Sequence, residues 1–176
     1  MKKLLTLVLV CILVLTCLPA FAEEVPETAI GVVETEQGLM AGVPGELHPD
    51  VTLFKGVPFA APPVGELRWK EPQDPEPWEG IRVCDTEGDA PVMHDYVNLL
   101  FTDPSTPWIE FYPDGAPPMS EDCLYLNIAT PAQSADEALP VVIWFHGGGL
   151  QNGFYYEAEF DPEVLASKGC IVVSIG

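Results

Sequence analysis

The residues best suited to chemistry are His146 and the three glycines Gly147–Gly149, which directly follow an apolar run over 141–145. Consecutive glycines permit backbone dihedrals that other residues avoid, and they present backbone N–H groups with no side chain in the way. Two such groups converging on one point form an oxyanion hole, which stabilises the negative oxygen that develops when a nucleophile attacks a carbonyl. The alternative interpretation is a flexible loop between a strand and a helix.

The strands and the helix predicted around the glycines place these residues where an oxyanion hole could form. The apolar run 141–145 is typical of a strand buried on both faces in a parallel sheet. A helix is predicted next, with Asp161 as N-cap, Pro162 at the first helical position and Gly169 as the stop signal, followed by a buried strand over 171–175. This order predicts a βαβ unit with a right-handed crossover. The glycines would lie at the carboxyl end of a strand, where ligands gather in open α/β sheets.

The chain before the glycines indicates strands and a long irregular segment. Apolar runs bounded by turn residues predict strands over 29–34, 39–42, 51–54 and 124–128. The first three are expected to form an antiparallel meander. Between residues 60 and 120 prolines recur too often for long helices. Aromatic residues in this segment either pin it to the core or line a pocket, and they are Trp69, Trp78, Trp108, Phe111 and Tyr112. Residues 23–176 are expected to form one domain.

The net charge argues against nucleic-acid and anionic-membrane partners, and the N-terminal residues indicate an exported protein. The 176 residues carry 7 Lys plus Arg against 27 Asp plus Glu, and 48% are hydrophobic, which excludes a disordered chain or a coiled coil. Nucleic acids and anionic membrane surfaces would repel so acidic a chain. Residues 1–22 predict a signal peptide cleaved after Ala22, because two lysines precede a short apolar run that ends in Ala20-Phe21-Ala22. A lipoprotein anchored at Cys17 is the alternative, and either form would be secreted or extracytoplasmic.

Three cysteines would remain after removal of the leader, in a compartment where disulfides persist. Because Cys84, Cys123 and Cys170 are odd in number, at least one thiol is free or pairs between chains. Cys170 opens an apolar run and is expected to be a buried small hydrophobe. Cys84 with Cys123 is the pair considered for a bridge, and sequence spacing leaves that pairing open.

Four blocks give the chain a resemblance to the type-B carboxylesterases, which are α/β-hydrolases that include para-nitrobenzyl-type esterases and cholinesterases. The blocks are Phe54–Ala60 with Pro62-Pro63, Leu67–Trp69 with Pro77–Gly80, Ser120–Asn127, and Pro140–Gly149. The resemblance implies the N-terminal part of an α/β-hydrolase fold, in which an antiparallel meander leads into a mixed, mainly parallel sheet.

The same resemblance implies a serine hydrolase that cleaves carboxylic esters through a triad of Ser, Asp or Glu, and His, with an acyl-enzyme intermediate. Gly148 and Gly149 resemble the oxyanion-hole donors of this family. Gly147 would allow the turn, and Leu150 would pack beneath or beside the acyl pocket. His146 is similar to the residue that leads the triplet, which implies a structural role. A small-molecule ester is the implied substrate. The sequence shows no metal-ligand cluster and no nucleotide-binding loop, so we expect no cofactor, and we expect no membrane contact beyond the leader.

The nucleophile of this mechanism is missing from the sequence. The elbow pattern G-x-S-x-G does not occur, and Ser120 and Ser174 lie before and within apolar strands. Family order places the elbow after the strand over 171–175. We therefore expect a truncated portion of a larger hydrolase, inactive by itself, with that last strand at an open, aggregation-prone edge. The alternatives are a non-catalytic adhesion or binding relative and an inactive gene fragment.

Two pairings also follow from the resemblance. Arg68 and Glu121 are expected to form a salt bridge that ties the proline-rich segment to the strand over 124–128. Such a bridge acts as a clamp if it is shielded from water, whereas an exposed pair contributes almost nothing. The family often bridges a cysteine in the position of Cys123 to one after Trp78. Cys84 falls several residues earlier than that pattern expects, so the bridge stays open.

Overall fold

The computed structural model describes residues 24–93, 103, 105 and 116–176. Its strands are β1 (Val32–Glu34), β2 (Leu39–Ala41), β3 (Val43–Pro44), β4 (Thr52–Pro58), β5 (Ile81–Val83), β6 (Ala90–Pro91), β7 (Met119–Ser120), β8 (Tyr125–Thr130), β9 (Val141–Phe145) and β10 (Ile171–Ile175). Its helical segments are η1 (Gly65–Leu67), η3 (Ala158–Phe160) and α3 (Glu163–Ala166). Within the described ranges, no helix has the length and apolar character needed to cross a membrane. The predicted leader and the residues Trp108, Phe111 and Tyr112 lie outside these ranges.

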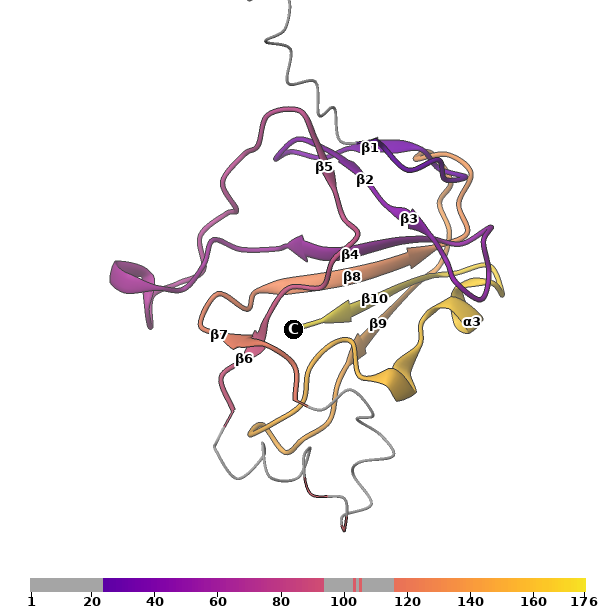
Figure 1. Ribbon diagram of the computed structural model, residues 1–176. Coiled ribbons are helices and arrows are strands. Elements are labelled where there is room, and N and C mark those ends of the chain that lie inside the picture. Colours follow the sequence, from indigo (N-terminus) through magenta and orange to yellow (C-terminus); the bar gives the residue numbers. More distant parts are fainter. Residues whose placement is uncertain (1–23, 94–102, 104, 106–115) are drawn as a thin grey trace, which may run out of the picture.

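A five-stranded sheet in the order β3-β4-β8-β10-β9 forms the centre of the structure (Figure 1). β10 pairs parallel with β9 and antiparallel with β8, while β4 pairs antiparallel with both β8 and β3. The prediction of a mixed sheet is confirmed. The prediction that it is mainly parallel is wrong for the described part of this sheet, because β9 with β10 is its one parallel pair and its other three pairs are antiparallel.

The predicted meander is divided between two sheets. The β1–β2 and β3–β4 pairs are antiparallel, as expected, but β2 also pairs parallel with β5 to form a separate sheet, β1-β2-β5. The chain passes from one sheet to the other at Gly42, between β2 and β3. A Cβ atom at Gly42 would lie 2.5 Å from the carbonyl oxygen of Leu53. Glycine therefore allows the two strands to approach closely enough for the chain to change sheets.

The main sheet is covered on opposite faces by α3 and by the small sheet. One face packs with α3 through a cluster of Val51, Leu53, Ala129, Ala166 and Val172. The other face packs with the small sheet through Met40, Phe54 and Cys84. Trp78 packs against this second cluster, and its indole nitrogen donates a hydrogen bond to the carbonyl oxygen of Leu39 at 2.7 Å. Trp78 thus pins the proline-rich segment, whereas Trp69 is exposed beyond η1, whose loop projects from the sheets in Figure 1.

The βαβ unit is confirmed, since β9, α3 and β10 follow one another and the two strands are parallel neighbours. The Asp161 carboxylate accepts a hydrogen bond from the backbone nitrogen of Glu163 at 2.8 Å, which is the capping contact that the sequence predicts. The helix begins one residue later than predicted, with Pro162 as its N-cap residue. Gly169, at φ 98°, lies just beyond the helix and provides the predicted stop.

β9 is one of the two edge strands of the main sheet and is largely exposed. Val141, Ile143 and Phe145 are 53–71% exposed on one face, while Val142 and Trp144 border α3 on the other. The prediction that this strand is buried on both faces is therefore wrong, because the described chain covers only the α3 side. The prediction that the strand over 171–175 forms the open edge is also wrong. That strand, β10, lies between β8 and β9, so it is paired on both sides and the edge beside it is formed by β9.

The three described cysteines have free thiols. Cys84 and Cys123, whose pairing the sequence left open, therefore form no disulfide in this structure. Cys84 is buried, and burial raises the pKa of its thiol. Burial also raises the pKa of the Cys123 thiol. Cys170 is only half-buried, so the prediction of a fully buried side chain is wrong, although it packs against the cluster beside α3.

Candidate active site

The glycine loop, which we define as residues 146–153, begins directly after the carboxyl end of β9. Gly148 and Gly149 have φ values of 105° and 63°, in the region that favours glycine. A Cβ atom at Gly148 would lie 1.8 Å from the carbonyl oxygen of Asn152, so no larger residue fits there without moving the loop. Leu150 also has a positive φ of 61°, an unusual conformation for a residue with a side chain.

Hydrogen bonds close the glycine loop on itself. The carbonyl oxygen of Gly148 accepts hydrogen bonds from the backbone nitrogens of Gln151 and Asn152, at 3.1 and 3.3 Å. The Nδ1 atom of His146 lies 2.8 Å from the carbonyl oxygen of the next residue. Gly153 packs so closely that a Cβ atom there would lie 2.4 Å from His146 Nδ1. His146 therefore contacts its own loop, and the structural role implied by the family resemblance stays a prediction.

The backbone N–H groups of Gly148 and Gly149 have no hydrogen-bond acceptor within the described part of the chain. Both residues lie beyond Phe145, the last residue of β9 that pairs with β10, so strand pairing does not occupy them. Unoccupied amides at this position are what an oxyanion hole requires. The side chain of Leu150 is fully exposed and does not pack on the described residues. A place for Leu150 and Gly147 beside an acyl pocket stays a prediction.

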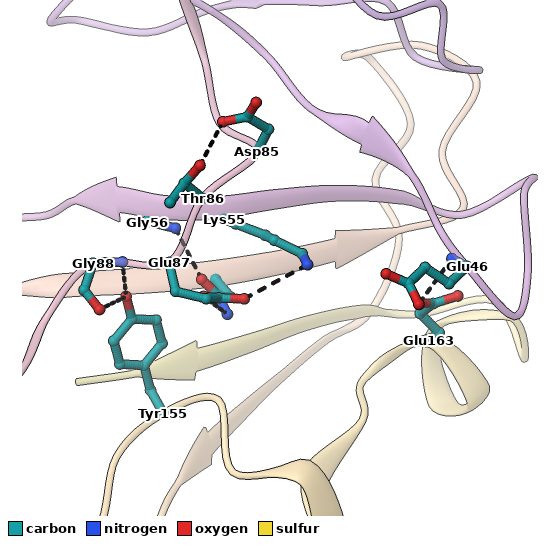
Figure 2. Close-up of polar contacts among 10 residues, drawn as sticks. Glu46, Lys55, Gly56, Asp85, Thr86, Glu87, Gly88, Tyr155 and Glu163 are labelled. Carbon is teal, nitrogen blue, oxygen red and sulfur yellow. Dashed lines mark hydrogen bonds and ion pairs between the residues drawn. The ribbon is translucent and has the colours of Figure 1, made fainter. Parts of the chain in front are cut away.

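A polar cluster lies between β4, β8 and the loop after β5 (Figure 2). The Glu87 carboxylate accepts a hydrogen bond from Asn127 Nδ2 at 2.7 Å and lies 3.8 Å from Lys55 Nζ. The Oδ1 atom of Asn127 accepts a hydrogen bond from the backbone nitrogen of Gly56 at 3.0 Å, where the pairing of β4 with β8 is irregular. Burial raises the pKa of Glu87, opposed by the Asn127 hydrogen bond and the Lys55 charge.

Tyr155 joins this cluster to the chain that follows the glycine loop. Its hydroxyl accepts a hydrogen bond from the backbone nitrogen of Gly88 at 2.7 Å and donates one to the carbonyl oxygen of Gly88 at 3.3 Å (Figure 2). The side chain is 1% exposed, and burial, with a smaller effect of the Glu87 charge, raises the pKa of its hydroxyl. This contact could not be predicted from the sequence, because no local pattern pairs a tyrosine with a glycine 67 residues earlier.

A cavity of about 240 Å³ adjoins the polar cluster on the α3 side of the main sheet. Its lining includes Lys55, Glu87, Asn127, Tyr155, Tyr156 and Ser174. Burial raises the pKa of Tyr156 to about 12. No residue of the glycine loop lines this cavity, so the polar cavity and the candidate oxyanion hole are separate places in the described structure.

The two serines considered in the sequence are not presented as nucleophiles. Ser174 lies in the interior of β10, paired with Trp144 and Asn127 on the neighbouring strands, and it is buried. Ser120 ends the short strand β7, and its hydroxyl accepts a hydrogen bond from the backbone nitrogen of Asp122 at 3.0 Å. Among the described residues, no group of three or more His, Cys, Asp or Glu side chains is arranged to hold a metal ion.

A sequence model of the carboxylesterase family matches residues 30–176. The chain belongs to the carboxylesterase family. Fumonisin B1 esterase of Sphingopyxis macrogoltabida is 42% identical over 141 residues, which are 80% of this chain and 23% of that protein. Para-nitrobenzyl esterase of Bacillus subtilis is 34% identical over 143 residues, or 81% and 26%. A solved PNB esterase structure superposes with a TM-score of 0.67 at 32% identity, covering 82% of this chain and 27% of that one.

These similarities confirm the family resemblance inferred from the four sequence blocks, and the structural neighbours share the carboxylesterase α/β-hydrolase fold. The chain spans about a quarter of the length of these carboxylesterase relatives. The elements that it shares with them include β9, the glycine loop and β10, because the family match extends to Gly176.

The salt bridge implied by the carboxylesterase resemblance is present. Arg68 and Glu121 are joined by a hydrogen bond between the guanidinium and the carboxylate. Their side chains are 54% and 46% exposed, so the pair is not shielded from water. An exposed pair of this kind contributes about 0–1 kcal/mol to the free energy of unfolding. The predicted contact between Arg68 and Glu121 is therefore confirmed. The prediction that the pair acts as a water-shielded clamp is wrong, because both side chains are exposed.

Proposed function

We propose that the chain is part of a carboxylic ester hydrolase and that Gly148 and Gly149 supply the donors of its oxyanion hole. The observation that carries this proposal is the state of the two amides, which lie just past the carboxyl end of β9 and have no acceptor in the described chain. Membership of the carboxylesterase family supports a small-molecule ester as the substrate class.

In the proposed reaction, a serine hydroxyl attacks the ester carbonyl carbon and a histidine accepts the hydroxyl proton. The carbonyl oxygen becomes negatively charged and accepts hydrogen bonds from the two glycine amides. When the tetrahedral intermediate collapses, the C–O bond to the alcohol breaks and the alkoxide leaves with the proton from histidine. Water then attacks the acyl-enzyme by the same sequence and releases the acid. Removing one oxyanion donor typically lowers the rate about 10²- to 10³-fold.

The catalytic triad is proposed to lie outside these 176 residues. The serine, the acidic residue and the histidine of the triad are proposed to follow Gly176 in a longer protein, because no elbow pattern occurs in the 176 residues. Export through cleavage after Ala22 is proposed from the leader sequence.

The test is to read the coding DNA beyond Gly176, express the complete protein and assay it with para-nitrophenyl esters of several acyl lengths. We expect a G-x-S-x-G elbow and ester hydrolysis. Replacing Gly148 with Ala should lower kcat by at least about 10²-fold, since the new Cβ atom would collide with the Asn152 carbonyl and displace the donors. Gly147→Ala should cost less, because the space around Gly147 is open. An elbow without serine, or a complete protein without esterase activity, would overturn the proposal.

A further inference from the structure

We propose that Tyr155 is a positioning residue, which holds the glycine loop in a fixed place relative to the main sheet. The inference rests on the proposed function, because the importance of the loop position follows from the role of Gly148 and Gly149. A displacement of about 1 Å in a reacting geometry can cost about 10²-fold in rate. An oxyanion hole built on a glycine-rich loop therefore needs an external anchor.

The first part of the anchor runs from the sheet to Gly88. Asn127 on β8 accepts a hydrogen bond from the backbone of Gly56 on β4 and donates one to the carboxylate of Glu87. Gly88 follows Glu87 directly and fits closely, since a Cβ atom there would lie 2.4 Å from the ring of Tyr125. The Gly88 backbone is thus held by two strands of the main sheet.

The second part runs from Gly88 to the glycine loop through Tyr155. Both hydrogen bonds of the Tyr155 hydroxyl go to the backbone of Gly88, so one side chain binds both the N–H group and the carbonyl oxygen of that residue. Two residues before Tyr155, the backbone nitrogen of Gly153 donates a hydrogen bond to the sulfur of Met93 at 3.3 Å. Gly153 in turn contacts His146 at the other end of the loop. The end of the loop is therefore fixed against the segment that Tyr155 holds.

Tyr155 also contacts the chain that leaves β10. A Cβ atom at Gly176 would lie 2.8 Å from Cδ1 of the Tyr155 ring, and the Gly176 backbone nitrogen donates a hydrogen bond to the Tyr125 carbonyl oxygen at 2.9 Å. The same side chain thus touches the residue just after β10 and anchors the loop just after β9. It is placed to keep these two neighbouring strand ends in register.

The experiment compares Tyr155→Phe with Tyr156→Phe in the 176-residue chain, by backbone amide hydrogen exchange. Tyr155→Phe keeps the ring but leaves the Gly88 backbone groups without their partner. The hydroxyl of Tyr156 makes no hydrogen bond to any described residue, so Tyr156→Phe is the matched control. The amides of Gln151, Asn152 and Gly153 report loop closure, because each donates a hydrogen bond within or from the loop. We expect their exchange to accelerate about tenfold or more in Tyr155→Phe and to stay unchanged in Tyr156→Phe.

A second variant applies if Tyr155→Phe does not fold. Asn127→Leu keeps a similar volume and removes the two side-chain hydrogen bonds that tie the segment of Glu87 and Gly88 to the sheet, while the hydrogen bonds of the glycine loop keep their partners, so it should accelerate exchange at Gln151 and Asn152. Unchanged exchange in the folded variants would overturn the inference. Because exchange does not depend on ester turnover, a complete protein that lacks esterase activity but shows the exchange response would overturn only the proposed function.

Discussion

The Glu163 carboxylate accepts a hydrogen bond at 2.9 Å from the backbone nitrogen of His48, which lies 115 positions earlier in the chain. The same carboxylate accepts hydrogen bonds from the backbone nitrogens of Glu46 and Leu47 at 3.1 and 2.9 Å. Figure 2 shows Glu163 beside Glu46, at the turn between β3 and β4. One buried side chain on α3 therefore satisfies three donors of a turn at the opposite end of the sequence.

Replacing Glu163 with Ala should destabilise the fold by about 2 kcal/mol or more, because three backbone donors lose a charged acceptor. The free energy of unfolding can be measured by urea denaturation of residues 23–176, the chain expected after removal of the leader. Glu66→Ala, at an exposed position in η1, is the matched control and should change the value by less than about 0.5 kcal/mol. Equal effects of the two changes would show that the Glu163 contacts contribute nothing specific.

Glu87 should make stability depend on pH. Burial raises its pKa above the ordinary value of 4.5. A carboxyl group whose pKa is higher in the folded state stabilises the fold below the unfolded pKa, and that contribution is lost as pH rises through the folded pKa. We therefore expect Glu87→Gln to remove a decline in stability that begins near pH 4.5 and continues upward. Urea midpoints across pH 4 to 7 measure this, and the exposed Glu79→Gln should leave the decline in place.

The thiols should differ in reactivity. In residues 23–176, Cys123 and Cys170 are half-buried and should react with a thiol reagent in the native state. Cys84 is buried and burial raises its pKa, so it should react only after unfolding. Three thiols should titrate in denaturant without a reductant. A total of one thiol under those conditions would mean that a disulfide forms and that the free-cysteine state is wrong.

The exposed edge strand β9 should make residues 23–176 prone to aggregation. Ile143 points to the uncovered face of this strand, so Ile143→Lys should raise the soluble yield with little change in the urea midpoint. Val173 occupies the paired position on the central strand β10, and Val173→Lys should instead lower the midpoint. Light scattering and denaturation of both variants give the comparison. If the two variants behave alike, strand order does not govern aggregation of this chain.

Features that depend on neighbouring residues could be predicted from the sequence. The hydrogen bond of Asp161 at the start of α3, the stop at Gly169 and the strands on either side of α3 all follow from short patterns, although the helix begins one residue later than those patterns predict. Features that depend on distant partners could not. The composition of 141–145 indicates burial, yet the covering of a strand is decided by elements elsewhere in the chain. The division of the meander at Gly42 depends in the same way on its contact with Leu53.

The candidate site likewise contains some features that a local sequence pattern predicts and others that depend on a distant partner. The glycine triplet was visible because its chemistry is contained in consecutive residues. Tyr155 carried no comparable signal, since it stands among other aromatic residues in Phe154-Tyr155-Tyr156 and its partner Gly88 lies in another part of the sequence. The family resemblance did predict one long-range contact, between Arg68 and Glu121, but the exposure of that pair required the structure.

The position of β10 between β8 and β9 has a consequence for synthesis on the ribosome. β9 is translated earlier, but its pairing partner in the sheet is β10. Until Ile175 has emerged from the ribosome, the segment 141–145 cannot pair with β10. The glycine loop that follows this segment then has no ordered strand to position it. Nascent chains that end before Ile175 should therefore expose the unpaired apolar segment 141–145 to chaperones. Once β10 has been synthesised, its pairing with this segment would fix β9 in the sheet.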